Sequence, residues 1–334
     1  MDGSRLPSVS RKARRTTTSA KRSSGGKRSG KRAQRSKNDV EREPKAESQK
    51  PVLMRILVTG AAGQLATAII ERFSAHADLL ACSRRELDVT DSGAVSERVS
   101  AFLPDVIVNC SAYNHVDRAE DDPVAAIDVN AIAVRTLGRA AASSGATLVH
   151  YSTDFVFDGR TTRPYTEDDE PRPESVYAAS KLLGEWFALL APRVFVLRVE
   201  SLFGGRVSKS SIDRMIDALL ERREARAFTD RTVSPSYVVD VAAATEALIE
   251  HGEPGLYHCV NSGFATWYEV VQEIATQLRC EGRIVPISVG DLPLAAPRPQ
   301  FAALSNAKLE RAGVAMPSWQ DALARHLRMR MGRT

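Results

Sequence analysis

The sequence predicts an α/β fold in which a doubly wound parallel sheet carries a smaller C-terminal cap. From Met54 onward, short apolar runs alternate with amphipathic helical stretches. The runs are continuously apolar, as in strands that helices cover on both faces. From about Gly204 the segments become shorter and less regular, which predicts a cap at the carboxyl ends of the strands. Together these observations indicate a Rossmann-type architecture.

The elements follow from the chain in order. The predicted strands of the sheet are RILVTG, LLACS, DVIVNCSA, TLVHYSTD and VFVLRV. The helices between them are predicted from Gln64 to Ala75, from Ser92, from Pro123 to Ser143 and through Lys181 to Leu190. Beyond residue 204 we expect helices near 208–225, 238–251, 266–279 and 318–330, and strands near GLYHCV and RIVPIS.

Charge divides the chain further. Residues 1–50 hold 16 Lys or Arg against 5 Asp or Glu, a net charge of +11, whereas the other residues carry a net charge of −6. The basic segment has few apolar residues, so it is expected to be disordered. It either binds nucleic acid through phosphate contacts or is a solvated leader without a partner. We predict a basic tail at 1–53, a Rossmann domain at 54–203, and at 204–334 mainly the cap, with some segments returning to the sheet.

Composition narrows the class of protein. The sequence has no apolar run of about 18 residues, so no membrane span is expected. Its cysteines are widely spaced, without a CxxC pair, and predict buried thiols with no metal site: Cys82, Cys110, Cys259 and Cys280. We expect a cytoplasmic protein. The oligomeric state stays open, with a homodimer among the alternatives.

A glycine turn joins the first strand to the first helix. The sequence there reads TGAAGQLA, with Gly60 placed for a tight turn and Gly63 for close approach of a pyrophosphate. The free N–H groups of the following helix, which starts at Gln64 and Leu65, favour phosphate. A simple strand-to-helix turn is the alternative, but the position within a βαβ series predicts an NAD(P)-binding site.

The end of the second strand indicates which cofactor is used. Arg84 and Arg85 stand where an enzyme specific for NAD carries an acid, and basic side chains suit a 2′-phosphate. NADPH is therefore favoured, with NADH as the alternative. Asp88 and Val89, in LDVTD, are predicted cofactor contacts at the adenine edge, whereas Asp91 contacts adenine or caps the next helix.

Three side chains form a candidate catalytic set. Tyr177 and Lys181 lie four residues apart in YAASK, so both project from one helix face. The ammonium is expected to lower the tyrosine pKa and make the phenol a general acid. Thr153, at the end of the fourth strand, would hydrogen-bond the oxygen of a substrate carbonyl, while Lys181 holds the cofactor ribose. A surface Tyr–Lys pair is the alternative.

At this point the chain resembles the extended short-chain dehydrogenases and, within them, the dTDP-4-dehydrorhamnose reductases. The motifs that carry the resemblance are VTGAAGQLA, LDVTD, PDVIVNCSAYNHVDRAEDDP, DVNA, LVHYSTDFVFDG, PYTEDDEPRPESVYAASKLLGE, RPQFAALSNAKLERAG and MPSWQDAL. The resemblance implies NADPH-dependent reduction of a 4-keto-6-deoxy sugar nucleotide, dTDP-4-dehydrorhamnose to dTDP-L-rhamnose. It places the triad on Thr153, Tyr177 and Lys181, and the sugar-nucleotide site in the cap.

The resemblance also implies contacts. It implies cofactor contacts at Gly60, Gly63, Gln64, Leu65, Asp88, Ala112, Tyr113 and Asn130. It implies substrate contacts at Asn114, Val116 and the loop after Val199, which includes Ser201. Two positions depart from the family: Ala66 replaces the third glycine of the turn, and Ser201 replaces a tryptophan that packs against the sugar.

Several side chains have competing interpretations. Arg298 is a candidate contact for a diphosphate, because a guanidinium fork suits phosphate. His115, a loop residue, either contacts ligand or has a structural role, and His150 is expected in the core. The tryptophans are interpreted as packing anchors: Trp186, Trp267 and Trp319.

Three other functions are weighed against the reductase. A nucleotide-sugar 4,6-dehydratase needs an acid after Asp154, where this chain has Phe155. A nucleotide-sugar epimerase matches the motifs less well. A non-catalytic NADP-binding regulatory protein, similar to the beta subunit of methionine adenosyltransferase, stays open because that protein also lacks the tryptophan at the position of Ser201.

Overall fold

The computed structural model describes residues 53–207 and 209–332 of the 334-residue chain. The predicted disorder and nucleic-acid binding of the basic tail fall on residues that lie outside these ranges, apart from Leu53.

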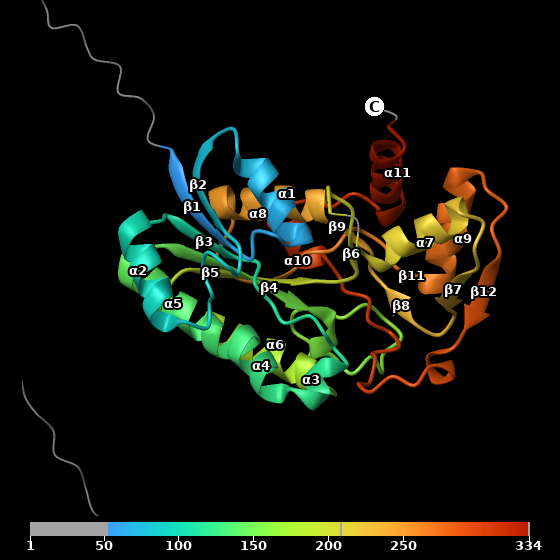
Figure 1. Ribbon diagram of the computed structural model, residues 1–334, viewed down its shortest axis with the longest axis horizontal. Coiled ribbons are helices and arrows are strands. Elements are labelled where there is room, and N and C mark those ends of the chain that lie inside the picture. Colours follow the sequence, from blue (N-terminus) through green and yellow to red (C-terminus); the bar gives the residue numbers. More distant parts are fainter. Residues whose placement is uncertain (1–52, 208, 333–334) are drawn as a thin grey trace, which may run out of the picture. The chain divides into compact units, whose positions relative to one another are not determined.

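A six-stranded sheet in the order β10-β5-β4-β3-β1-β2 forms the centre of the fold (Figure 1). All of its neighbouring strands are parallel. The strands are β1 (Met54–Thr59), β2 (Ala77–Cys82), β3 (Val106–Asn109), β4 (Thr147–Thr153), β5 (Val194–Val199) and β10 (Gly255–His258). Because the order reverses at β1, the carboxyl ends of β1 and β3 border the crevice in which such sheets bind ligands. The doubly wound α/β fold predicted from the sequence is confirmed.

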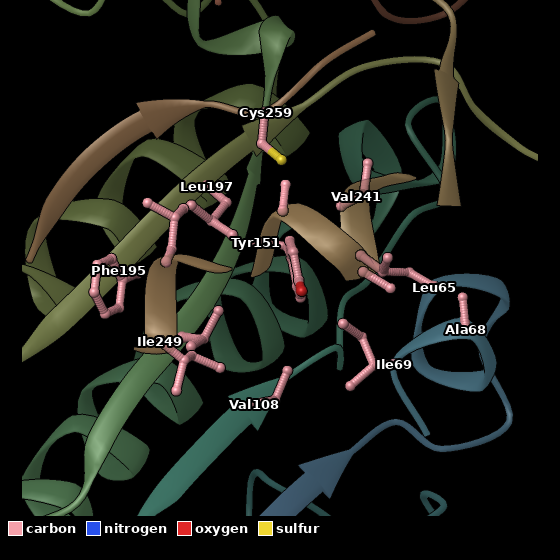
Figure 2. Packing of buried hydrophobic residues seen from close by; sticks show 14 of the residues in the cluster. Leu65, Ala68, Ile69, Val108, Tyr151, Phe195, Leu197, Val241, Ile249 and Cys259 are labelled. Carbon is pink, nitrogen blue, oxygen red and sulfur yellow. The ribbon is translucent and has the colours of Figure 1, made fainter. Parts of the chain in front are cut away.

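Helices cover both faces of this sheet. Figure 2 shows side chains of α1 and α8 on one face packing against strand residues such as Val108 and Leu197. The opposite face packs against α2, α5 and α6, with Leu57 and Leu148 at its centre. The bounds are α1 (Gln64–Phe73), α8 (Val238–His251), α2 (Ser92–Phe102), α5 (Ala133–Ser144) and α6 (Val176–Ala188). Each large buried aliphatic side chain contributes about 1.5–3 kcal/mol, which makes the continuous apolar strands the main source of stability.

A second core lies in the cap. Helices α7 (Ser211–Leu220) and α9 (Trp267–Leu278) pack around the parallel pair of β7 (Ala225–Phe228) and β12 (Ile284–Ile287), together with α11 (Trp319–Arg330). The other elements in this half are β6 (Leu202–Phe203), β8 (Thr232–Val233), β9 (Ser236–Tyr237), β11 (Ala265–Thr266), η3 (Val289–Asp291) and α10 (Ala307–Arg311). Trp267 and Trp319 are buried as predicted, whereas Trp186 is 58% exposed. The interpretation of Trp186 as a packing anchor is therefore wrong, because its face of α6 points to solvent.

The sheet takes residues from both predicted halves of the chain. Strand β10 pairs with β5, and α8 packs beside α1, although both elements come after residue 204. The buried Arg198 on β5 forms a two-point ion pair with Glu185 of α6 and contacts His258 of β10. Packing is therefore continuous across residue 203. The predicted boundary between a cofactor-binding domain and a substrate-binding cap at this residue stays a prediction about function.

The prediction of one long Ala-rich helix from Pro123 to Ser143 is wrong in the middle of the stretch, where the α-helix is interrupted. It is divided into α4 (Pro123–Ile127), a π-helical turn η1 (Asp128–Ile132) and α5, and a short α3 (Arg118–Asp121) precedes it. Asn130, in the π-helical turn, is 1% exposed and its side chain bonds Tyr113 and Ser180. Gly184 of α6 lies against the carbonyl of Asn130, where a Cβ atom would stand 2.1 Å from the oxygen. A π-helical turn contains one more residue than an α-helical turn. Here that turn carries Asn130, whose contacts are with residues distant in the sequence.

Candidate active site

A cleft of about 820 Å³ opens between the carboxyl ends of the strands and the cap. The predicted site residues that line it are Gly63, Gln64, Leu65, Ala112, Asn114, Val116, Thr153, Tyr177, Lys181, Ser201 and Arg298. Those that do not line it are Gly60, Arg84, Arg85, Asp88, Val89, Tyr113 and Asn130. The structure therefore brings most of the predicted residues to one place.

The glycine turn has the conformation expected from the sequence. Gly60 has φ +66°, and a Cβ atom there would lie 2.9 Å from the carbonyl carbon of Cys110. The N–H of Gly63 donates to the oxygen of Gly60 at 2.8 Å and closes the turn. Helix α1 has no side-chain cap on its first N–H groups. This backbone cradle fits the pyrophosphate of a dinucleotide, because free N–H groups at a helix N-terminus bind anions.

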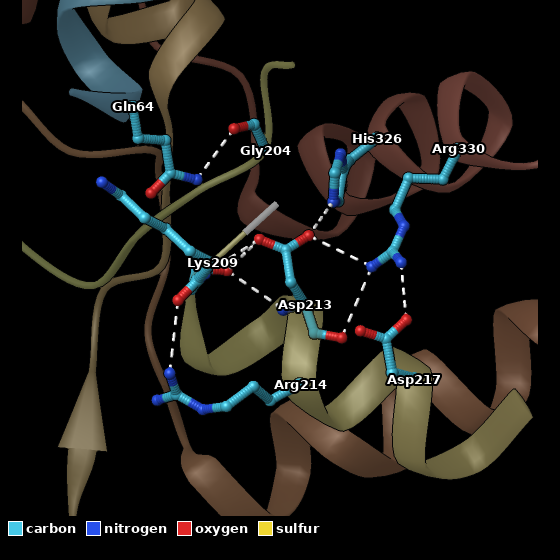
Figure 3. Close-up of polar contacts among 9 residues, drawn as sticks. Gln64, Gly204, Lys209, Asp213, Arg214, Asp217, His326 and Arg330 are labelled. Atoms are coloured by element: carbon cyan, nitrogen blue, oxygen red, sulfur yellow. Dashed lines mark hydrogen bonds and ion pairs between the residues drawn. The ribbon is translucent and has the colours of Figure 1, made fainter. Parts of the chain in front are cut away.

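Gln64 connects this turn with the beginning of the cap. Its side-chain amide donates to the carbonyl oxygen of Gly204 at 2.8 Å (Figure 3). Gly204 has φ +82°, and a Cβ atom there would meet the ring of Tyr237 at 2.2 Å. The two halves of the cleft are thus joined at a position where only glycine fits.

The basic side chains after β2 lie outside the cleft. The side chain of Arg84 is 83% exposed, with its Nε 3.7 Å from the carboxylate of Asp88. Thr90 hydrogen-bonds the Asp88 carboxylate, which lowers its pKa. Val89 packs its side chain into the core, so only its backbone is left for a cofactor contact. Asp91 caps α2 by accepting from two backbone N–H groups, the alternative that the sequence left open.

Asn130 acts at a distance from the cleft. Its amide bonds both backbone groups of Tyr113 and the hydroxyl of Ser180, and it is buried. The amide of Asn130 is already used by the protein, and the predicted cofactor contact at Asn130 stays a prediction. Asn130 positions the loop of Tyr113 against helix α6.

The three catalytic candidates meet at the end of β4. Ser175 caps α6, and Tyr177 and Lys181 project from the first turns of this helix. Lys181 donates from Nζ to the carbonyl oxygen of Tyr151 at 2.6 Å. Burial lowers the pKa of Lys181 to about 8. Thr153 donates to Asp154 at 2.9 Å and accepts from the N–H of Phe155 at 3.3 Å.

The pKa of Tyr177 moves against the sequence-based expectation. Burial raises it above its ordinary value, Asp154 raises it further, and a hydrogen bond with Thr153 lowers it only in part. The predicted lowering by Lys181 is wrong for the ligand-free chain, because desolvation is the larger effect and the ammonium is bonded to Tyr151. The phenol consequently keeps its proton over the neutral range and is available as a donor.

Charged side chains also line the cleft. Arg298 pairs with Asp117 at 2.7 Å, and its guanidinium lies over the ring of Phe155. His115, which also lines the cleft, packs edge-on against Tyr113. Arg298 is thus held beside the cleft, and a diphosphate would have to share it with Asp117.

Ser201 adopts an unusual backbone conformation in this part of the cleft. Its φ is +45°, in the left-handed region that non-glycine residues rarely occupy. The strained position lies two residues after the end of β5. Such strain at a ligand site indicates that the neighbouring segments fix the backbone there.

Sequence reasoning missed a group of residues on the cap side. They are Lys209, Ser210, Ser211 and Arg214 at the beginning of α7, and Arg231 and Trp267 nearby. The signal was present in KSSIDR, where two cations flank a capping box at a helix start. The cap contains no recognised motif, so KSSIDR does not by itself indicate a ligand site.

Buried polar contacts hold the start of α7 in place. Asp213 bonds Ser210 at 2.6 Å and His326 at 2.9 Å, and it pairs with Arg330 (Figure 3). Burial raises the pKa of Asp213, but the bonds from His326 and Ser210 outweigh this, so the pKa is lowered. Asp213 therefore stays ionised and fixes the helix end that faces the cleft.

Residues 53–207 and 209–332 contain no group of three or more His, Cys, Asp or Glu side chains arranged to hold a metal ion. None of the helices described is long and apolar enough to cross a membrane.

Comparison with known proteins gives one consistent family. Residues 54–331 match the RmlD substrate binding domain. "Spore coat polysaccharide biosynthesis protein SpsK" of Bacillus subtilis is 31% identical over 83% of this chain and 98% of its own length. A "dTDP-4-dehydrorhamnose reductase" of Mycobacterium tuberculosis H37Rv is 36% identical over 81% of this chain and 91% of its own. The crystal structure of the Bacillus anthracis dTDP-4-dehydrorhamnose reductase in complex with NADP superimposes with a TM-score of 0.79, at 32% identity, over 82% of this chain and 99% of that one.

Proposed function

The chain belongs to the family of the RmlD substrate binding domain, and on this premise we propose that it reduces dTDP-4-dehydrorhamnose to dTDP-L-rhamnose with NADPH. The observation that carries the proposal is the meeting of Thr153, Tyr177 and Lys181 in one cleft with the glycine turn. Neither alternative, the epimerase or the regulatory protein, is favoured by the relatives, several of which are named as dTDP-4-dehydrorhamnose reductases.

The chemistry follows from the atoms in the cleft. Bound NADPH supplies the hydride for the carbonyl carbon of the sugar. Tyr177 donates its phenolic proton to the carbonyl oxygen, and Thr153 hydrogen-bonds that oxygen and orients it. Lys181, whose pKa burial lowers to about 8, returns a proton toward the tyrosine and holds the cofactor ribose.

Groups in the cleft and beside it are assigned by charge. The backbone turn at Gly60 and Gly63 fits the pyrophosphate of the cofactor, and Arg84 and Arg85 the 2′-phosphate. Lys209, Arg214 and the N-terminus of α7 face the cleft, and we assign them to the diphosphate of the sugar nucleotide. A cytoplasmic location and a homodimer belong to the same proposal.

The test follows NADPH absorbance with dTDP-4-dehydrorhamnose, for the wild-type chain and Tyr177→Phe. We expect steady oxidation by the wild type and a loss of about 10³-fold in kcat for the variant, because the general acid is removed. NADPH binding, measured by calorimetry, should be unchanged.

Tyr268→Phe is the matched control, since Tyr268 packs against the cap core and does not line the cleft. Its activity should equal that of the wild type. NADPH binding without any turnover by the wild type would contradict the proposal and favour another keto-sugar or a regulatory role.

A further inference from the structure

Two buried acids stand side by side behind the catalytic threonine. Thr153 and Val199 are the last paired residues of β4 and β5, so Asp154 and Glu200 leave neighbouring strand ends in register. The paired residues Thr153 and Val199 lie about 4.8 Å apart, so the backbones of Asp154 and Glu200 begin close together, before Asp154 enters a 3₁₀ turn. Both residues are nearly inaccessible, with 3% and 2% exposure.

Each acid has one oxygen in use and one without a partner. Asp154 accepts from Thr153 through Oδ1, and Glu200 accepts from the N–H of Ser234 through Oε2 at 2.7 Å. Among the residues described, Asp154 Oδ2 and Glu200 Oε1 have no hydrogen-bond partner, and neither has Nε of Arg231. Buried polar atoms are rarely left unpaired. The charge of Asp154 raises the pKa of Glu200, so the two acids interact, and a proton placed between their unpaired oxygens would pair both.

The charges of the region require the same proton. Burial raises the pKa of Asp154 to about 6, and burial together with Asp154 raises the pKa of Glu200 well above its ordinary value. Arg231 is the nearby cation, and it opposes both shifts. Two ionised carboxylates beside one guanidinium would leave a buried net negative charge, whereas one shared proton brings the group to neutrality.

The groups that face the pair from other elements do not remove this requirement. Arg298, from the segment after η3, lies near Arg231 and disfavours its charge. Tyr177, from α6, is neutral because its pKa is raised. Lys181, on the same helix, is bonded to Tyr151. The shared proton therefore remains the means of balancing the buried charge.

The position of this proton changes what Thr153 can do. The threonine hydroxyl has one hydrogen, which it now donates to Asp154. A carboxylate is the stronger acceptor, because hydrogen bonds to a charged group are roughly twice as strong as those between neutral groups. When the proton is on Oδ2 of Asp154, its Oδ1 is a neutral carbonyl oxygen and releases the threonine hydrogen more easily.

We propose that Asp154 and Glu200 share one proton, and that its transfer from Glu200 Oε1 to Asp154 Oδ2 frees the Thr153 hydroxyl to hydrogen-bond the carbonyl oxygen of the substrate. Asp154 and Glu200 are thus positioning residues that act through Thr153. The transfer consumes no other reactant, since one O–H bond breaks as another forms. The role of Thr153 in it rests on the proposed reductase function.

The first test compares the pH dependence of kcat for wild type, Glu200→Gln and Asp154→Asn. Glutamine cannot supply the proton, so Asp154 ionises and retains the threonine hydrogen. We expect Glu200→Gln to lose about tenfold in kcat at pH 8 and to regain it as the pH falls toward about 6, where Asp154 takes a proton from solvent. KM and NADPH binding should not change.

Asparagine at position 154 imitates the protonated acid, with a neutral oxygen toward Thr153. We expect Asp154→Asn to stay within about threefold of the wild type with a flat profile, and the double variant to resemble it. Asp158→Asn is the matched control, because Asp158 bonds Tyr165 outside the cleft. A Glu200→Gln profile parallel to the wild type, or an Asp154→Asn loss as deep as that of Thr153→Val, would overturn the proposal.

A second measurement does not depend on turnover. The infrared spectrum of the NADPH complex at pH 7.5 should contain a protonated carboxylic acid band that the double variant lacks and Asp158→Asn retains. Absence of this difference overturns the shared proton even if the enzyme is active. If the band differs as expected but the wild type shows no turnover, the shared proton is supported and the reductase function is rejected.

Discussion

The two sides of the cleft are built in different ways. We call the side proposed for the cofactor the cofactor wall; it consists of residues 60–66 and 110–113 and helix α6 with its neighbour Asn130. We call the side proposed for the sugar nucleotide the substrate wall; it consists of residues 200–201, 209–214, 231 and 298. In the cofactor wall, close backbone contacts fix the geometry: Gly184 lies against Asn130, and Lys181 bonds the carbonyl of Tyr151. In the substrate wall, charged side chains line the cleft, and the buried Glu200 and Arg231 keep unpaired atoms.

This difference shows which wall can change. A wall made of atoms in close contact allows little substitution, because any added volume displaces backbone. A wall of charged side chains with spare hydrogen-bonding capacity can accept a different ligand at a smaller cost in stability. Ser201, whose backbone is in the left-handed region, lies in the second wall. We expect changes in the cofactor wall to alter folding and changes in the substrate wall to alter affinity.

The largest effect should come from crowding the cofactor wall with Gly184→Ala. A Cβ atom would lie 2.1 Å from the carbonyl oxygen of Asn130, so helix α6 or the π-helical turn must move. We expect the free energy of unfolding in urea to fall by about 3 kcal/mol. Gly138→Ala is the control: its Cβ would meet its nearest neighbour at 3.7 Å, so the same change should be neutral or stabilise α5 by up to about 1 kcal/mol. Equal effects at the two glycines would refute this view of the wall.

A smaller effect, on affinity alone, is expected in the substrate wall. Replacing Lys209 and Arg214 together by Ala removes two cations at the start of α7 that face the cleft. KM for the sugar nucleotide should rise about tenfold, equivalent to about 1.4 kcal/mol, with the urea midpoint and NADPH binding unchanged. Arg223→Ala, an exposed cation beyond the other end of α7, should leave KM as it is. An equal rise in both variants would indicate a general charge effect.

The smallest effect concerns the exposed cations after β2. Arg84→Ala should reduce the preference for NADPH over NADH by about fivefold, because an exposed charge contributes little in water. The ratio of kcat/KM for the two cofactors measures this preference. Arg139→Ala, exposed on α5, is the control of equal charge. A preference that persists in Arg84→Ala and in Arg85→Ala would assign cofactor selection to other residues.

Sequence predicted the sheet and the cofactor turn because their causes are local. Continuous apolar runs make buried strands, and Gly60 is needed where a left-handed residue approaches Cys110. The Tyr-x-x-x-Lys spacing and the end of the fourth strand pointed to Thr153, Tyr177 and Lys181, the family resemblance implied the same triad, and the structure brings the three into one cleft. These features depend on neighbours in the chain or on a motif.

Other features depend on partners far away in the chain. The π-helical turn coincides with contacts of Asn130 with Tyr113, Ser180 and Gly184, which no periodicity reveals. The raised pKa of Tyr177 follows from burial, and the interaction of Asp154 with Glu200 follows from the register that places Thr153 beside Val199. Residue types alone could not predict these because each effect arises from the folded environment.

Completion of the sheet by β10 affects how the chain is made. Strand β5 ends at Val199, but its partner β10 is not finished until His258 has been added. At ordinary rates of translation this interval is on the order of several seconds. During it the nascent protein presents an unpaired strand edge, so pairing with the same strand of a neighbouring nascent chain on the polysome competes with correct folding.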